Sequence, residues 1–121
     1  MADVFNNAIN RNISMVKGDT LSFGFQIQGL ENQEPDAVYF SSKASLEDET
    51  YIFQKTLEDG IVMRSYDAEN DVYTYGVRVA PSDTSDEECG RYFYDLSIHV
   101  NGDVLTLMRG MLEIVWEAEN E

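Results

Sequence analysis

Residues 90–116 read GRYFYDLSIHVNGDVLTLMRGMLEIVW, and this stretch decides the fold class. Its first half alternates apolar and polar residues with a period of two, which is typical of a strand with one buried face. The apolar set is Tyr92, Tyr94, Leu96, Ile98 and Val100. Asn101-Gly102 follows, and this pair readily adopts the positive φ angles of a type I′ turn. We therefore predict an antiparallel hairpin of strands 91–100 and 103–116.

The second strand of this hairpin contains a glycine at an unexpected place. We assign its even-numbered positions to the buried face, and Gly110 falls among them. A glycine where a core side chain is expected indicates a bulge or the close approach of another backbone. The other residues assigned to this inward set are Val104, Thr106, Met108, Leu112, Ile114 and Trp116.

The same alternation occurs elsewhere in the chain. It is clear over 20–28 and 73–79, and weaker over 11–16, 37–44, 51–56 and 61–66. We expect a short turn at residues 58–60, joining 51–56 to 61–66, and a crossing between two sheets over residues 80–90, with one helical turn in 82–88 capped by Ser82 or Asp83. The prediction is an all-β, immunoglobulin-like antiparallel β-sandwich of seven to eight strands.

Length and charge bound the organisation and the partners. The chain has 121 residues, 23 acidic and 8 basic, with a formal net charge of -15. This size predicts one domain over 1–121, with a core of about 14–116 and flexible ends at 1–10 and 117–121. We expect no nucleic-acid partner, because such binding depends on Lys and Arg, and no membrane partner. The start has no signal-peptide pattern, so synthesis in a cytoplasm is expected.

Candidate chemical groups are few. His99, the only histidine, lies on the polar side of its predicted strand, and Cys89 is surrounded by carboxylates that disfavour the thiolate. Acidic clusters at 47–49, 67–71 and 83–88 carry oxygen ligands of the kind Ca²⁺ prefers, without the spacing of an EF-hand. We predict no enzyme activity and no cofactor.

Aromatic residues are more numerous than a small core requires. They make up 12% of the chain, and Phe93 is out of phase with its buried neighbours. An outward aromatic side chain can contact another protein, or it can stack on a sugar ring. The alternative function is therefore a carbohydrate-binding β-sandwich module, with Ca²⁺ in an acidic loop.

The order of the short motifs resembles a known family. The motifs are VKGDT at 16–20, FQK at 53–55 before DGI at 59–61, GRYFYDL at 90–96, NGD at 101–103 and GML at 110–112. Over roughly residues 14–115 the chain resembles the N-terminal domain of tailed-phage upper baseplate proteins and related short prophage proteins. The resemblance implies an immunoglobulin-like assembly module without catalytic residues. It implies synthesis in the bacterial cytoplasm followed by incorporation into a virion.

The expected function is thus a non-enzymatic structural module of a phage or prophage particle, associated with its tail or baseplate. Its expected partners are other virion proteins or further copies of itself. We place the interface on the outer face of the predicted hairpin, because an apolar patch there exceeds what a monomer normally exposes. The candidate interface residues are Phe93, Leu105, Leu107 and Met111.

Overall fold

The computed structural model describes residues 2–3 and 9–116. Eight of its strands are four residues or longer within this part of the chain, and only one helical turn, α1 (Pro81–Thr84), interrupts them. The prediction of an all-β, immunoglobulin-like sandwich is therefore confirmed. The strands are β1 (Ala2–Asp3), β2 (Ile9–Asn10), β3 (Ile13–Val16), β4 (Leu21–Gln28), β5 (Ala37–Lys43), β6 (Phe53–Leu57), β7 (Gly60–Asp67), β8 (Val72–Val79), β9 (Gly90–Val100) and β10 (Asp103–Val115).

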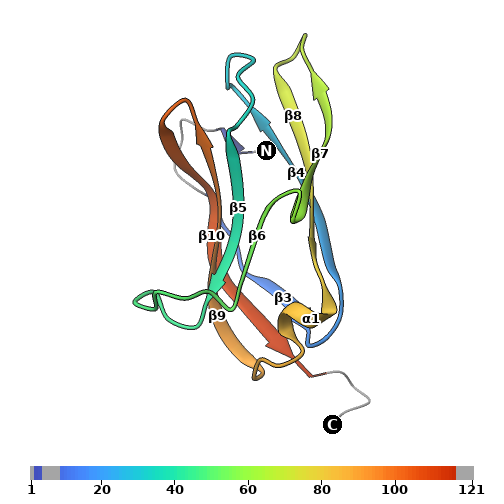
Figure 1. Cartoon of the computed structure of the whole chain (residues 1–121), viewed down its shortest axis with the longest axis vertical. Coiled ribbons are helices and arrows are strands. Elements are labelled where there is room, and N and C mark those ends of the chain that lie inside the picture. Colours follow the sequence, from blue (N-terminus) through green and yellow to red (C-terminus); the bar gives the residue numbers. More distant parts are fainter. Residues whose placement is uncertain (1, 4–8, 117–121) are drawn as a thin grey trace.

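The strands form one hydrogen-bonded path that folds back on itself to make two facing layers. One layer has the order β1-β4-β8-β7, and the other has β6-β5-β9-β10, with β2 and β3 along the free side of β10. Figure 1 shows β4, β7 and β8 opposite β5, β9 and β10, with the layers spreading apart at the end away from α1. The sheet is mixed, where an antiparallel one was predicted. Among the described residues, five pairings are antiparallel, whereas β1 runs parallel to β4, β2 and β3 to β10, and β6 to β7.

The chain changes layers between β6 and β7, where the sequence predicted an ordinary short turn. Thr56 pairs with Gly60 and Leu57 with Ile61 in parallel, so β7 continues in the direction of β6. Positive φ angles of 67° at Glu58 and 98° at Gly60 allow this offset. The short connection is therefore present, but it carries the chain from one layer to the other.

The β9–β10 hairpin confirms its predicted turn and antiparallel pairing. Asn101 and Gly102 both have positive φ, 51° and 85°, and Val100 lies opposite Asp103. At the other end of β9, the Tyr92 hydroxyl donates a hydrogen bond to the Glu88 carbonyl. This contact is the tyrosine corner found at this position in immunoglobulin-like sandwiches.

Residues 80–90 cross between the layers, as expected, but the helical turn there is capped differently. Ala80 is the N-cap, and its backbone N–H donates to the Asp83 carboxylate over 2.7 Å. The Asp83 carboxylate also binds the Lys55 ammonium at 2.7 Å. Asp83 is therefore the third residue of the helical turn and not its N-cap. Its carboxylate accepts the free N–H at the start of the turn.

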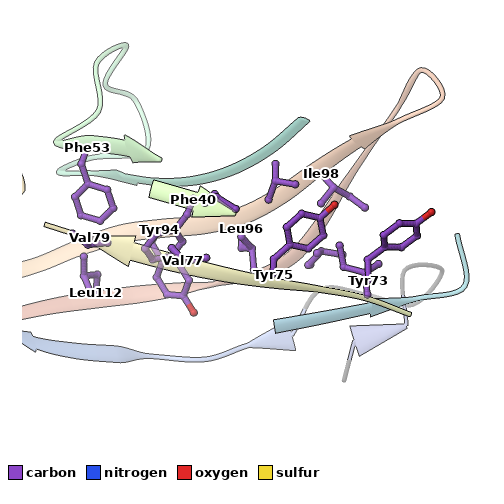
Figure 2. Close-up of a cluster of buried hydrophobic side chains, with 14 of the residues drawn as sticks. Phe40, Phe53, Tyr73, Tyr75, Val77, Val79, Tyr94, Leu96, Ile98 and Leu112 are labelled. Atoms are coloured by element: carbon purple, nitrogen blue, oxygen red, sulfur yellow. The ribbon is translucent and has the colours of Figure 1, made fainter. Parts of the chain in front are cut away.

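Aromatic rings hold the two layers together. The Phe40 ring on β5 lies 5.1 Å from that of Phe23 on β4, 5.7 Å from Phe53 and 5.6 Å from Tyr94. Figure 2 shows Phe40 and Tyr94 near Val77 and Leu96, and Phe53 beside Val79 toward one end of the cluster. Because the chain contains a single cysteine, no disulfide joins the layers, and packed rings fill the centre of the sandwich.

Of the residues predicted to lie in flexible ends, Ile9 and Asn10 form β2 and pair with Met108 and Arg109, and Ala2 and Asp3 form β1. Residues 1, 4–8 and 117–121 lie outside the described residues. In the part of the chain that is described, no helix is long and apolar enough to cross a membrane.

Candidate protein-interaction surfaces

Two of the four predicted interface residues lie side by side on the outer face of the hairpin. Phe93 on β9 is directly opposite Met111 on β10, and Lys43 on β5 is opposite Phe93 on its other side. Phe93 and Met111 are half-buried, as is Lys43. These three side chains form a short, weakly apolar row across the outer face.

The other two residues, Leu105 and Leu107, do not lie on that face, and this part of the prediction is wrong. Leu107 is 5% exposed and belongs to the core, and Leu105 is half-buried against the same core. A β-bulge causes the difference, because the pairing passes from Thr106 directly to Met108 and leaves Leu107 as the extra residue. The odd-numbered residues therefore face inward before the bulge and the even-numbered residues after it.

Leu107 instead lines a groove between the free side of β4 and the β2–β3–β10 edge of the opposite layer. The groove has a volume of about 800 Å³. Arg11 is the single charged residue among the described residues that line it, and none of them is acidic. Its main apolar lining residues are Ile9, Ile13, Phe23, Phe25, Leu107 and Met108.

One wall of the groove is fixed by hydrogen bonds around Arg11. The Arg11 N–H donates to the Arg109 carbonyl over 2.9 Å, and the Arg11 carbonyl accepts from the Tyr94 hydroxyl. One residue on, the Asn12 side-chain oxygen accepts the Met111 N–H at 3.1 Å. The segment between β2 and β3 is thereby attached to β9 and β10.

The opposite wall is β4, whose Phe23 and Phe25 are only half-buried although they alternate like core residues. The Phe25 ring stacks on Tyr75 at 5.4 Å and also lines the groove. The sequence pattern of β4 is the same as that of a fully covered strand. No sequence signal therefore distinguished this groove, because exposure here depends on which strand covers the edge.

The predicted chemical candidates lie apart from the groove. His99 is on the outer face of β9, where its ring meets the Tyr39 ring edge-on at 5.0 Å. Cys89 precedes β9 and is partly buried against the core. The structure thus places these two residues in separate environments, neither of them beside the groove.

Two acidic side chains in the described loops accept local hydrogen bonds. Hydrogen bonds from Asn70 hold the pKa of Asp67 below its usual value. The Asp71 carboxylate accepts the backbone N–H groups of Glu31 and Asn32 at 2.8 and 2.7 Å. Among residues 2–3 and 9–116, no three His, Cys, Asp or Glu side chains gather as metal ligands would.

Three exposed aromatic side chains lie at separate places, each with one ring face occupied. Tyr66 stacks on Tyr73 at 4.4 Å. The Lys43 ammonium lies over Tyr51, and the Lys17 ammonium lies over Trp116. They do not form a common aromatic platform.

Comparison with known proteins identifies the fold alone. No family model and no curated protein matches the chain. Among solved structures, a family 123 glycoside hydrolase from Clostridium perfringens is similar, with 12% identity, a TM-score of 0.53 and coverage of 90% of this chain. This chain spans 23% of that hydrolase chain. A structure from a study of cell-adhesive interactions of VGSC beta subunits matches 89% of this chain and 93% of its own, with 13% identity and a TM-score of 0.44. At such identity, the likeness to the hydrolase concerns the β-sandwich and not its activity.

Proposed function

We propose that this protein is a non-enzymatic assembly module that acts through protein–protein contacts in the tail or baseplate of a phage or prophage particle. The proposal of protein–protein contacts rests on the apolar groove between β4 and β10, whose described lining has no acidic residue. Acidic residues account for 23 of the 121 positions, yet none of the described lining residues is acidic. An apolar hollow on so acidic a chain favours a protein partner.

The placement in a virion rests on the resemblance of residues 14–115 to phage upper baseplate domains. Within the motif GRYFYDL, Tyr92 forms the corner expected of immunoglobulin-like sandwiches in general, which agrees with the fold that the resemblance implies. Virion proteins assemble in copy numbers set by particle symmetry. The expected partners are therefore neighbouring virion proteins or further copies of this chain.

Co-expression with the products of the genes that flank this one tests this proposal. We expect at least one of these proteins to co-purify with the chain, and light scattering to give a defined stoichiometry for the complex. A monomer at every concentration, with none of these proteins bound, would overturn the proposal. The carbohydrate-binding alternative stays a prediction, which a glycan array checks directly.

A further inference from the structure

We infer that the free edge of β4, residues 21–26, is the place where a partner protein adds an extended apolar segment as an additional strand of the sheet. This inference rests on the proposed function and specifies the mode of contact. It follows from three features of β4: its unpaired backbone, its lack of edge protection and the groove beside it.

The backbone of β4 is paired on one side only over most of its length. β8 pairs with all eight residues of β4, whereas β1 on the other side meets only Ile27 and Gln28. Within the described residues, no further hydrogen bond reaches the backbone of residues 21–26. Alternate N–H and C=O groups of this stretch therefore point toward the groove, and an added strand would satisfy them.

The edge also lacks the features that normally prevent strand addition. Residues 21–26 read LSFGFQ, without a charged residue or a proline, and their pairing with β8 has no bulge. The outer edge of the same layer is different, because β7 carries Arg64 at a bulge between Met63 and Ser65. Charges and bulges protect edge strands from unwanted pairing. Their absence from β4 is expected of an edge that a partner covers.

The lining of the groove suits one added strand. Six residues of an added strand extend about 20 Å. Side chains on its inward face would meet Phe23 and Phe25 from β4, and Leu107 and Met108 from the other layer. Those on its outward face would remain in solvent. The added segment should therefore have apolar residues at alternate positions.

Charge indicates that the segment belongs to a different protein. A second copy of this chain would bring another net charge of -15 to the surface, which opposes close approach. A basic partner is attracted by the same field, and a neutral partner is not repelled by it. Arg11 is the one charged residue in the described lining, so the groove itself repels only cationic groups. The occupant is therefore an uncharged, alternating apolar segment of a neutral or basic partner.

Amide hydrogen exchange of the full chain with synthetic peptides tests this inference. The probes are peptides with a core of about eight alternating valine and threonine residues, in both phases, flanked by lysines. Matched probes carry glutamates in place of the lysines, or a proline in the centre of the core. We expect alternate amides of residues 21–26 to exchange rapidly in the free protein and to become protected with the lysine-flanked peptides. Binding should be weaker with the glutamate flanks and lost with the proline.

A pair of variants locates the contact. Phe25→Ala should weaken peptide binding about tenfold or more, whereas Phe93→Ala, on the outer face, should leave it within about twofold. If Phe25→Ala does not fold, the exchange pattern of the unmodified chain decides alone.

Several results would overturn the inference. One is protection of all amides of residues 21–26 in the dilute free protein, and another is failure of every lysine-flanked peptide to bind at about 1 mM. Protection that appears with rising protein concentration alone would assign the edge to a second copy instead. Binding that protects β9 and β10 around Phe93 would reject the β4 edge and leave the proposed function standing, because co-purification tests that function separately.

Discussion

The backbone carbonyl of Arg11 lies against the Cα of Gly110, in the space that a side chain would occupy. A Cβ on Gly110 would contact the Arg11 carbonyl oxygen more closely than real Cβ atoms approach, and it would lie 2.8 Å from the carbonyl carbon. The Tyr94 hydroxyl, opposite Gly110 in the hairpin, donates to the same oxygen. Gly110 therefore allows the segment between β2 and β3 to close over β10 and form a wall of the groove.

Gly110→Ala should destabilise the fold by about 1–3 kcal/mol, because the added methyl group must displace backbone. Urea unfolding measures the loss. Gly24→Ala on β4 is the matched control, since its Cβ would lie 3.3 Å from the Tyr75 carbonyl oxygen, a tight contact that a small shift relieves. An equal loss for the two variants would contradict the role assigned to Gly110.

A charged side chain should lower the stability of the fold at Leu107 but not at Met111. Leu107→Asp places a carboxylate in the core and should lower the free energy of unfolding by at least about 3 kcal/mol. Met111→Asp changes the outer face and should leave the fold intact. Circular dichroism and urea unfolding of both variants check this prediction. A folded, stable Leu107→Asp protein would contradict the bulge-shifted register of β10.

The Tyr92 corner should contribute about 1 kcal/mol, the usual net value of an intramolecular hydrogen bond. Tyr92→Phe removes the hydroxyl that donates to the Glu88 carbonyl and keeps the buried ring. Tyr51→Phe, at an exposed tyrosine, is the control. The midpoint of urea unfolding should fall for the first variant and not for the second, with the slope unchanged in both.

Alkaline pH should destabilise the protein through two tyrosines. Burial raises the pKa of Tyr73 and of Tyr75 to about 12. Because these folded-state values exceed the ordinary pKa of about 10, their contribution is fully present below pH 10 and is lost as pH rises toward 12. Unfolding free energies measured from pH 9 to 12 should show this decline. It should be shallower in Tyr73→Phe and Tyr75→Phe, and an unchanged decline in both variants would contradict the assignment.

Salt should stabilise the protein. A net charge of -15 on 13.8 kDa makes the folded state repel itself, and screening acts over about 10 Å at 0.1 M salt. The melting temperature should therefore rise from low to moderate NaCl concentration. A flat or falling trend would show that the acidic residues are already neutralised by local pairing or by a bound cation.

The sequence by itself was sufficient for the features that depend on neighbouring residues. Period-two alternation predicted the strands, and Asn101-Gly102 predicted the hairpin, because only a few residues accept the positive φ angles of its turn. The close approach at Gly110 could also be predicted. A glycine inside an apolar alternation indicates that something else occupies the space of a side chain.

Tertiary structure decided which face each residue of β10 presents and where the sandwich stays open. One extra residue at Leu107 reverses the inward set, and the sequence alternates on both sides of the bulge without marking it. The change of layer after β6 depends on long-range pairing, of β6 with β5 and of β7 with β8. The free edge of β4 depends on long-range pairing too, because β8 pairs along the other edge of this strand. Alternation records that one face of a strand is buried, but it does not record which strand, if any, pairs with each edge.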